Sequence, residues 1–232
     1  VRPDTRRVHL AHAASGGEGW VRTMELAAVD DLLDLDLTAT LAPGGTGLPG
    51  VDSTDDGVWL VCTHGRRDAC CARLGRPVAA ALTGQVPGEV WESTHTGGHR
   101  FAANLIHLPT GVMFARVEPD EVAAIAGRLV EGDLTLAHYR GRTTQSQDVQ
   151  AAEIFLRRAL DVTALDAVAA VGSPEPAEPD ATAILDVRDR AEVTRYAVTV
   201  DRRPTGMLRP LSSGDTELQD PGAWRLVSLG QR

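Results

Sequence analysis

The sequence predicts an α/β fold in which a central sheet is flanked by helices, with a small antiparallel β unit at the C-terminus. Val58–Cys62 and residues 89–94 are short, apolar and rich in β-branched or aromatic side chains, as buried strands are. The alanine-rich stretch 71–82 between them is typical of a helix. These three segments predict a β-α-β unit.

Three further segments complete the central unit. Residues 104–108 and 112–117 flank Pro109-Thr110-Gly111, which predicts a β-hairpin. A helical turn is expected just before it, at 100–103, and a helix just after it, over 119–130, where a proline lies at the start. The order strand, helix, strand, short helix, hairpin, helix is the thioredoxin-like order.

The N-terminal 56 residues are predicted to be the first part of this domain. Residues 7–13 alternate as a strand does, and 24–37 have the mixed apolar and acidic pattern of a short amphipathic helix or helix-turn. Residues 41–56, rich in Gly, Pro, Asp and Thr, predict a loop. Because the chain begins at Val1 without Met, we expect the N-terminal part to be truncated.

The C-terminal half predicts one helix and a separate β unit. The helix is expected over 145–160, and the Pro-rich acidic stretch 172–180 predicts a linker. Strands are expected at 184–187, 193–200 and 224–229. The predicted organisation is an N-terminal part (1–56), a thioredoxin-like domain with its C-terminal helix (57–160), a linker (161–180) and a small β-rich tail (181–232).

Composition excludes several classes of function. The net charge of −9 and the pI near 5.2 argue against a nucleic-acid-binding surface. No apolar run approaches the roughly 20 residues that cross a bilayer, and no secretory signal is apparent, so we expect a soluble cytoplasmic protein. All 23 basic residues are Arg. This composition suggests a GC-rich bacterial genome, and it excludes chemistry that depends on lysine.

All three cysteines and three of the seven histidines, His64, His95 and His99, lie between residues 62 and 99. Cys62 and Cys71 are separated by eight residues, and His95 and His99 by three. Each pair follows a predicted buried strand. Loops that follow neighbouring parallel strands emerge at the same edge of a sheet, so we expect the four side chains to converge there. A clustered, odd number of cysteines in a cytoplasmic chain favours metal or redox chemistry over disulfides.

Two metal groups suit this donor set. Zinc held by two thiolates and two imidazoles would be structural and redox-silent. A [2Fe–2S] cluster with two Cys on one iron and two His on the other would have Rieske-like ligation. Cys70 precedes Cys71 directly and has nearly the same spacing to Cys62, so the residues alone leave the second cysteine open.

The motifs CTHGRRDACCARLGRP and VWESTHTGGHRFAANL resemble the sucrase/ferredoxin-like family, whose members are similar to thioredoxin-like ferredoxins. The resemblance runs from about residue 59 through YRGRTTQ to residue 160. It implies Cys62, Cys71, His95 and His99 as ligands of a [2Fe–2S] cluster, with the histidines in the place of a second cysteine pair. It also implies that Cys70 is not a ligand.

Several residues flank these ligands. Arg66, Arg67, Asp68 and Arg100 are expected to be solvated loop charges, with a role in partner docking as the alternative. Thr63 and Thr96 are candidates to donate hydrogen bonds to cluster sulfurs, or else ordinary loop caps. His64 is expected to be a hydrogen-bond donor near the cluster, with a role as a rival ligand as the alternative. Cys70 is expected to be a small buried residue, with a spare thiol near the cluster as the alternative. His107 is expected to be structural. Residues 139–142, YRGR, predict a basic turn that ties the last helix to the core through acidic residues.

We therefore expect a ferredoxin-like electron carrier with an unidentified redox partner protein, no nucleic acid and no membrane. Two alternatives remain open at this point. A thioredoxin-like thiol oxidoreductase would use Cys62 or Cys70, although the chain has no C-x-x-C pair. A zinc-binding domain would serve as an interaction module. If the protein were an enzyme, it would be an oxidoreductase.

Overall fold

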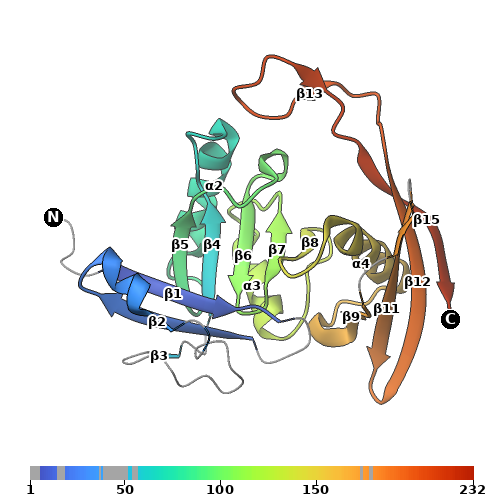
Figure 1. Ribbon diagram of the computed structural model, residues 1–232, viewed down its shortest axis with the longest axis horizontal. Coiled ribbons are helices and arrows are strands. Elements are labelled where there is room, and N and C mark those ends of the chain that lie inside the picture. Colours follow the sequence, from blue (N-terminus) through green and yellow to red (C-terminus); the bar gives the residue numbers. More distant parts are fainter. Residues whose placement is uncertain are drawn as a thin grey trace.

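Five strands form the central sheet of the protein (Figure 1). The computed structural model describes residues 6–14, 19–36, 38, 52–53, 57–172, 175–177 and 180–232. Along the sheet the order is β5 (Glu89–Ser93), β4 (Val58–Cys62), β6 (Asn104–Leu108), β7 (Val112–Ala115) and β8 (Tyr139–Arg142). β4 and β5 are parallel, whereas β6 is antiparallel to β4 and β7.

This topology confirms the thioredoxin-like prediction. A parallel β-α-β unit built from β4, α2 (Ala69–Leu82) and β5 is followed by a β-β-α unit built from β6, β7 and α3 (Val122–Val130). A single 3-10 turn, η2 (His99–Phe101), connects the two units where the sequence predicts a helical turn. Each element predicted for the central unit is present, and its ends differ from the prediction by three residues at most.

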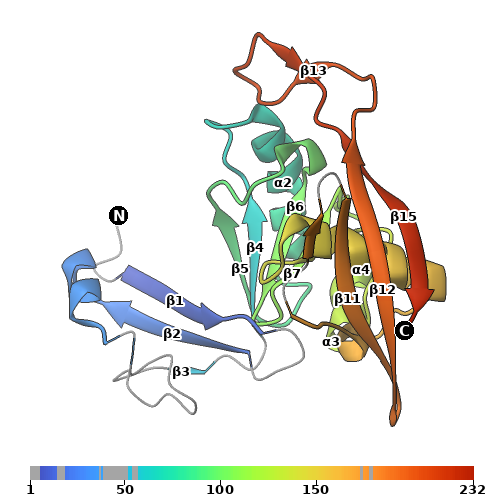
Figure 2. The same cartoon turned by 45° about the vertical axis from the view of Figure 1, so that its right-hand side comes forward.

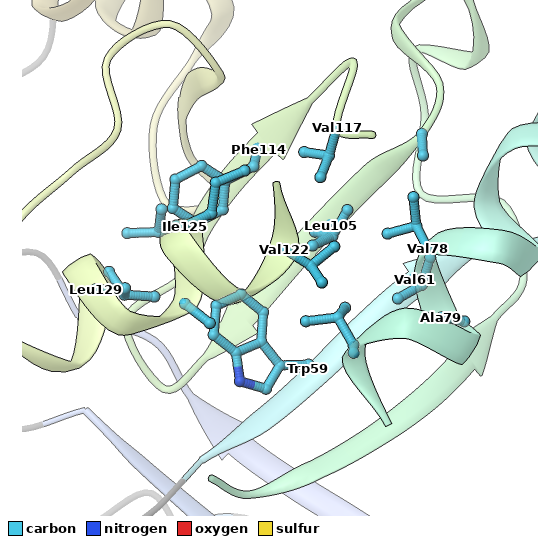
Figure 3. Packing of buried hydrophobic residues seen from close by; sticks show 14 of the residues in the cluster. Trp59, Val61, Val78, Ala79, Leu105, Phe114, Val117, Val122, Ile125 and Leu129 are labelled. Carbon is cyan, nitrogen blue, oxygen red and sulfur yellow. The ribbon is translucent and has the colours of Figure 1, made fainter. Parts of the chain in front are cut away.

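The two helices bury one apolar stripe each against the sheet (Figure 3). α2 buries Val78, Ala79 and Leu82, and α3 buries Ile125 and Leu129, among others. These side chains enclose a core centred on sheet residues that include Trp59, Val61, Leu105 and Phe114. The β4 run VWLVC is apolar throughout because both of its faces are covered.

An N-terminal ribbon lies beside the outer strand β5 (Figures 1 and 2). It consists of β1 (Arg6–His12), β2 (Trp20–Leu26), the 3-10 helix η1 (Val29–Asp34) and β3 (Asp52–Ser53). Arg7 donates a hydrogen bond to Glu89 on β5, and the His9 ring meets Trp91 edge-on at 5.1 Å. The strand predicted over 7–13 is therefore confirmed, as β1.

The short amphipathic helix or helix-turn predicted over 24–37 is present only as the 3-10 helix η1 (Val29–Asp34), and the prediction is wrong for residues 24–26. Residues 24–26 pair with β1 as the end of β2, and only a 3-10 helix follows. Cross-strand hydrogen bonds determine the backbone conformation of residues 24–26, and a local sequence pattern does not show which strands will pair. The loop predicted over 41–56 includes β3, and its residues 41–51 and 54–56 lie outside the described residues.

Helix α4 (Gln147–Leu160) lies between the central sheet and a second, antiparallel sheet (Figure 2). That sheet contains β10 (Glu175–Ala177), β11 (Asp180–Asp189), β12 (Glu192–Arg203) and β15 (Ala223–Gln231), with β9 (Val168–Ala170) also paired to β11. Ala152 and Leu156 of α4 pack against Leu185 and Val198 in a second hydrophobic core. The antiparallel C-terminal β unit is therefore confirmed.

The stretch predicted as a linker, 161–180, contains ordered elements. The 3-10 helix η3 (Leu165–Ala167) precedes β9, and β10 pairs with β11. Between β12 and β15 the chain forms a long excursion with a small hairpin, β13 (Arg209–Pro210) and β14 (Leu218–Gln219), which extends over the N-terminal end of α2 (Figure 1). No described helix is long and apolar enough to cross a membrane.

A buried polar network attaches α4 to the central sheet. Glu153 and Arg157 are fully buried, and Arg157 Nε donates to Glu153 Oε1 at 2.7 Å. The Tyr139 hydroxyl on β8 donates to the same oxygen at 2.8 Å, and the Arg157 guanidinium also reaches the carbonyl oxygens of Ala164 and Leu165. Residues 139–142 thus tie the helix to the core as a strand, not as the predicted turn, because β8 pairs with β7.

Replacing Glu153 with Ala should destabilise the protein by about 3 to 5 kcal/mol, because Arg157 would remain buried without its counter-ion. Urea unfolding followed by circular dichroism measures this loss. Asp186→Ala is the matched control, since Asp186 pairs with a half-exposed Arg195 and its loss should cost about 1 kcal/mol or less. Equal losses in the two variants would contradict the structural role of the network.

Candidate metal centre

The two candidate ligand loops emerge at one edge of the sheet. Cys62 is the last residue of β4 and pairs in register with Ser93, the last residue of β5. The Thr63 N–H donates to the Ser93 carbonyl at 3.1 Å, which extends the pairing by one step. The loop that leads into α2 and the loop that contains His95 therefore begin side by side, as the parallel register requires.

Cys62 and Cys71 form a buried thiol pair. Cys62 is 1% exposed and Cys71, in the first turn of α2, is 0% exposed. Burial, together with the neighbouring Cys62, raises the pKa of the Cys71 thiol to about 12. A buried thiol pair suits a group that replaces the protons with positive charge, as a metal does.

Cys70 has a different environment from Cys71. It is half-buried, and its Sγ donates to the backbone carbonyl of His99 at 3.5 Å. This contact links the start of α2 to the second ligand loop. The adjacent cysteines thus play separate parts: Cys71 lies beside Cys62, and Cys70 lies beside the backbone of His99.

His99 is oriented by a buried carboxylate. Its Nδ1 lies 3.2 Å from Oδ2 of Asp68, the N-cap residue of α2, which is 0% exposed. That oxygen has no hydrogen-bond partner of good geometry among the described residues. A carboxylate that faces one ring nitrogen fixes the orientation of the ring and leaves the other nitrogen for a metal.

Asp68 is itself held by the C-terminal excursion. Its Oδ1 accepts hydrogen bonds from the Ser212 hydroxyl at 2.9 Å and from the Ser213 N–H at 2.7 Å. Burial alone would raise the pKa of Asp68, but these hydrogen bonds and the nearby His99 lower it below its ordinary value. The expectation that Asp68 is a solvated loop charge is therefore wrong, because a segment 145 residues away covers it.

His95 lies in the same loop as His99 but is exposed. Its ring centroid is 6.5 Å from that of His64, in the loop after β4. The loop between the two histidines turns at Gly97 and Gly98, both with positive φ. A Cβ on Gly98 would overlap the guanidinium of Arg140, which donates to the Gly97 carbonyl at 3.3 Å. Arg140 thus supports the turn that brings the histidine loop back to the sheet.

The other predicted neighbours lie around this centre. Thr63 is buried, and Arg66 and Arg100 are exposed. His64 Nδ1 and Thr96 Oγ1 are buried and have no hydrogen-bond partner among the described residues. The pKa of Arg100 is lowered by burial and then by the positive charges of Arg202 and Arg209 in the C-terminal unit. His107, as expected, is structural: it packs on Trp59 at 4.6 Å.

Two contributors escape sequence reasoning. A Cβ on Gly75 would overlap the Cys62 carbonyl, so this glycine lets α2 approach β4 at the cysteine pair. Asn104 bridges the Gly98 carbonyl, at 3.1 Å, and the guanidinium of Arg140, at 3.2 Å. A glycine inside an otherwise helical segment is a weak signal of close packing, whereas nothing in the sequence marks Asn104.

The candidate ligands lie as a cysteine pair and a histidine pair in two different loops. In the part of the chain that the structure describes, no three His, Cys, Asp or Glu side chains converge as one ion would require. A two-iron cluster needs only two protein ligands on each iron. Fold and donor set thus define a thioredoxin-like protein with a buried cysteine pair beside a two-histidine loop.

The family follows from comparison with known proteins. The family model described as sucrase/ferredoxin-like matches residues 5–141, more than half of the chain, so the chain belongs to this family. Among solved structures, the thioredoxin-like [2Fe–2S] ferredoxin from Aquifex aeolicus is 16% identical with a TM-score of 0.35, covering 38% of this chain and 94% of the ferredoxin. The thioredoxin-like assignment itself rests on the strand order and directions.

The curated relatives are yeast proteins named altered inheritance of mitochondria protein 32. That of Meyerozyma guilliermondii is 33% identical over 101 residues, 39% of this chain and 36% of the relative. That of Eremothecium gossypii is 30% identical over 97 residues, 35% of this chain and 31% of the relative. The match thus spans about a third of these relatives. Their yeast origin argues against the bacterial origin that the arginine-only composition predicts.

Burial predicts which thiol of the metal-free protein reacts first. Cys70 is half-buried, whereas Cys62 and Cys71 are buried, so iodoacetamide should modify Cys70 well before the other two. Peptide mass spectrometry on a time course measures the three rates, and protein unfolded in urea provides the control in which they should converge. Faster modification of Cys71 than of Cys70 in the folded protein would contradict the structure.

Proposed function

We propose that the protein is a ferredoxin-like electron carrier that holds a [2Fe–2S] cluster through Cys62, Cys71, His95 and His99. The observation that carries the proposal is that a buried cysteine pair and a carboxylate-oriented histidine belong to two loops that begin at the same edge of a thioredoxin-like sheet. Membership in the sucrase/ferredoxin-like family supports it. A cytoplasmic location and an unidentified redox partner protein belong to the same proposal.

The residues present fit such a group in several respects. The thiols lie together in an apolar environment, which suits one iron. His99 presents a ring whose Nδ1 faces Asp68, and the buried Thr96 hydroxyl and His64 nitrogen are free to hydrogen-bond a polar group. His95 is exposed, and its loop turns on two glycines. We infer that the histidine side of the centre is the side nearer solvent.

This ligation has consequences for redox chemistry. A cluster with two neutral imidazoles carries less negative charge than one with four thiolates, so it accepts an electron at a higher potential. The protein's own task is then to hold His99 through Asp68, exclude water around the thiols, and let the outer imidazole exchange its proton with solvent. The potential should fall as pH rises once that proton is lost.

A thiol oxidoreductase fits the geometry less well. Such enzymes need an accessible thiolate with a lowered pKa. Cys62 and Cys71 are buried, and the pKa of Cys71 is raised. Cys70 has no partner in a C-x-x-C arrangement. The zinc-domain alternative also has less support. A structural zinc ion would need all four candidate ligands around one ion, and the family description, sucrase/ferredoxin-like, favours a ferredoxin-like group instead.

Cys71 and Cys70 provide a matched test of the cluster. Cys71→Ser should abolish the visible charge-transfer bands and the Rieske-like EPR signal of the reduced protein, whereas Cys70→Ser should retain both. Iron and acid-labile sulfide assays on anaerobically purified protein accompany the spectra. A colourless wild-type protein containing zinc would contradict the proposed cluster. Loss of the visible bands and the EPR signal in Cys70→Ser alone would instead assign Cys70 as the ligand.

Asp68→Asn tests how the carboxylate tunes His99. Asn has nearly the same shape and can still accept the hydrogen bond from the Ser213 N–H, but it carries no negative charge beside the imidazole. The reduction potential of the cluster should therefore rise, because the added electron meets less repulsion. Protein-film voltammetry measures the shift. Asp215→Asn, in the same C-terminal excursion, removes an equal charge without touching His99 and should change the potential less; equal shifts would contradict the assigned role.

A further inference from the structure

An arginine-lined groove lies next to His99, and none of the three cysteines is among the residues that line it. Its volume is about 530 Å³, and it runs between the central unit and the C-terminal sheet, with α4 along one wall. Five arginines line it, contributed by η2, the end of β7, β8, α4 and β12: Arg100, Arg116, Arg140, Arg158 and Arg202. Asp and Glu are absent from the described residues that line it, in a chain with 32 acidic residues and a net charge of −9.

These arginines lack the counter-ions that arginines elsewhere in the protein have. Arg128 pairs with Asp133, and Arg195 pairs with Asp186. Within the described part of the chain, none of the five groove arginines forms an ion pair with a carboxylate. Their polar contacts are to uncharged oxygens, such as the Pro221 carbonyl for Arg202 and the Leu136 carbonyl for Arg158.

Three of the guanidinium groups gather around one aromatic ring. The Cζ atoms of Arg100, Arg116 and Arg140 lie 4.8, 5.3 and 5.2 Å from the centroid of Phe101. Cation–π attraction stabilises each of them, but like charges at this spacing repel. Burial and then the charge of Arg100 lower the pKa of Arg140. An anion in the groove would relieve this repulsion.

The groove also offers apolar contact area. Ile154 and Phe155 of α4 and Trp224 of β15 line it together with Phe101. A volume of a few hundred cubic ångströms, apolar walls and a few convergent charged groups are the usual features of a small-molecule site. Guanidinium groups bind carboxylates and phosphates in two-pronged geometry.

We propose that this groove binds a small organic anion, with a carboxylate or phosphate group on the arginines and an apolar body against Phe155 and Trp224. The site is distinct from the proposed cluster and does not depend on it. Because His99 and Gly98 also line the groove, a bound anion would lie against the histidine side of the metal centre. The two halves of the protein thus meet at a ligand site that neither forms alone.

Isothermal titration calorimetry with phenyl phosphate and phenylacetate tests the proposal and separates phosphate from carboxylate. At least one of the two should bind saturably, with affinity that falls as salt rises, while neutral phenol should not bind. Arg116→Gln/Arg158→Gln should weaken binding about tenfold or more, the loss expected for charge-assisted hydrogen bonds. Both residues lie outside the proposed cluster ligands.

The control double variant is Arg128→Gln/Arg195→Gln, which changes the net charge equally but lies outside the groove. It should bind like the wild type, and circular dichroism should show both double variants folded. Failure of both anions to bind the wild type would overturn the proposal, and so would equal weakening in the two double variants. Phenol binding as tightly as the anions would overturn the role of the arginines.

Discussion

The parallel pairing of β4 with β5 is the constraint on which the rest of the candidate site depends. Its register places Cys62 opposite Ser93, so the two loops that follow begin at one edge of the sheet. The approach of α2 to β4 at Gly75 then places Cys71 beside Cys62. The loops that carry the two pairs of candidate ligands, separated by 23 residues in sequence, begin side by side because of this strand pairing.

Around this edge, polar groups from distant segments control the histidine loop. Asp68 faces His99 from the start of α2, and Ser212 and Ser213 hold Asp68 from the C-terminal excursion. Arg140 supports the turn at Gly98 from β8. A buried carboxylate is costly unless its oxygens form hydrogen bonds, and here the C-terminal unit donates both hydrogen bonds to Oδ1. The β-rich C-terminal part therefore contributes to the environment of His99.

The arginines of the protein differ in whether they have carboxylate partners. Several arginines of this acidic protein pair with carboxylates, as Arg128 and Arg195 do, whereas five line one groove without such partners among the described residues. The groove exists because α4 separates the central sheet from the C-terminal sheet, and the Glu153–Arg157 pair attaches that helix to β8. The network that stabilises the interface between the two sheets thus also forms a wall of the groove.

By itself, the sequence determined the order of elements in the central unit and the positions of the Cys and His pairs, because apolar strands, alanine-rich helices and ligand spacing are local patterns. It did not determine β2, whose pairing with β1 overrides a helix-like pattern. Nor did it reveal that Asp68 is buried, or that five arginines from five elements share one groove. Those features depend on contacts between residues far apart in the chain, and only the tertiary structure decides them.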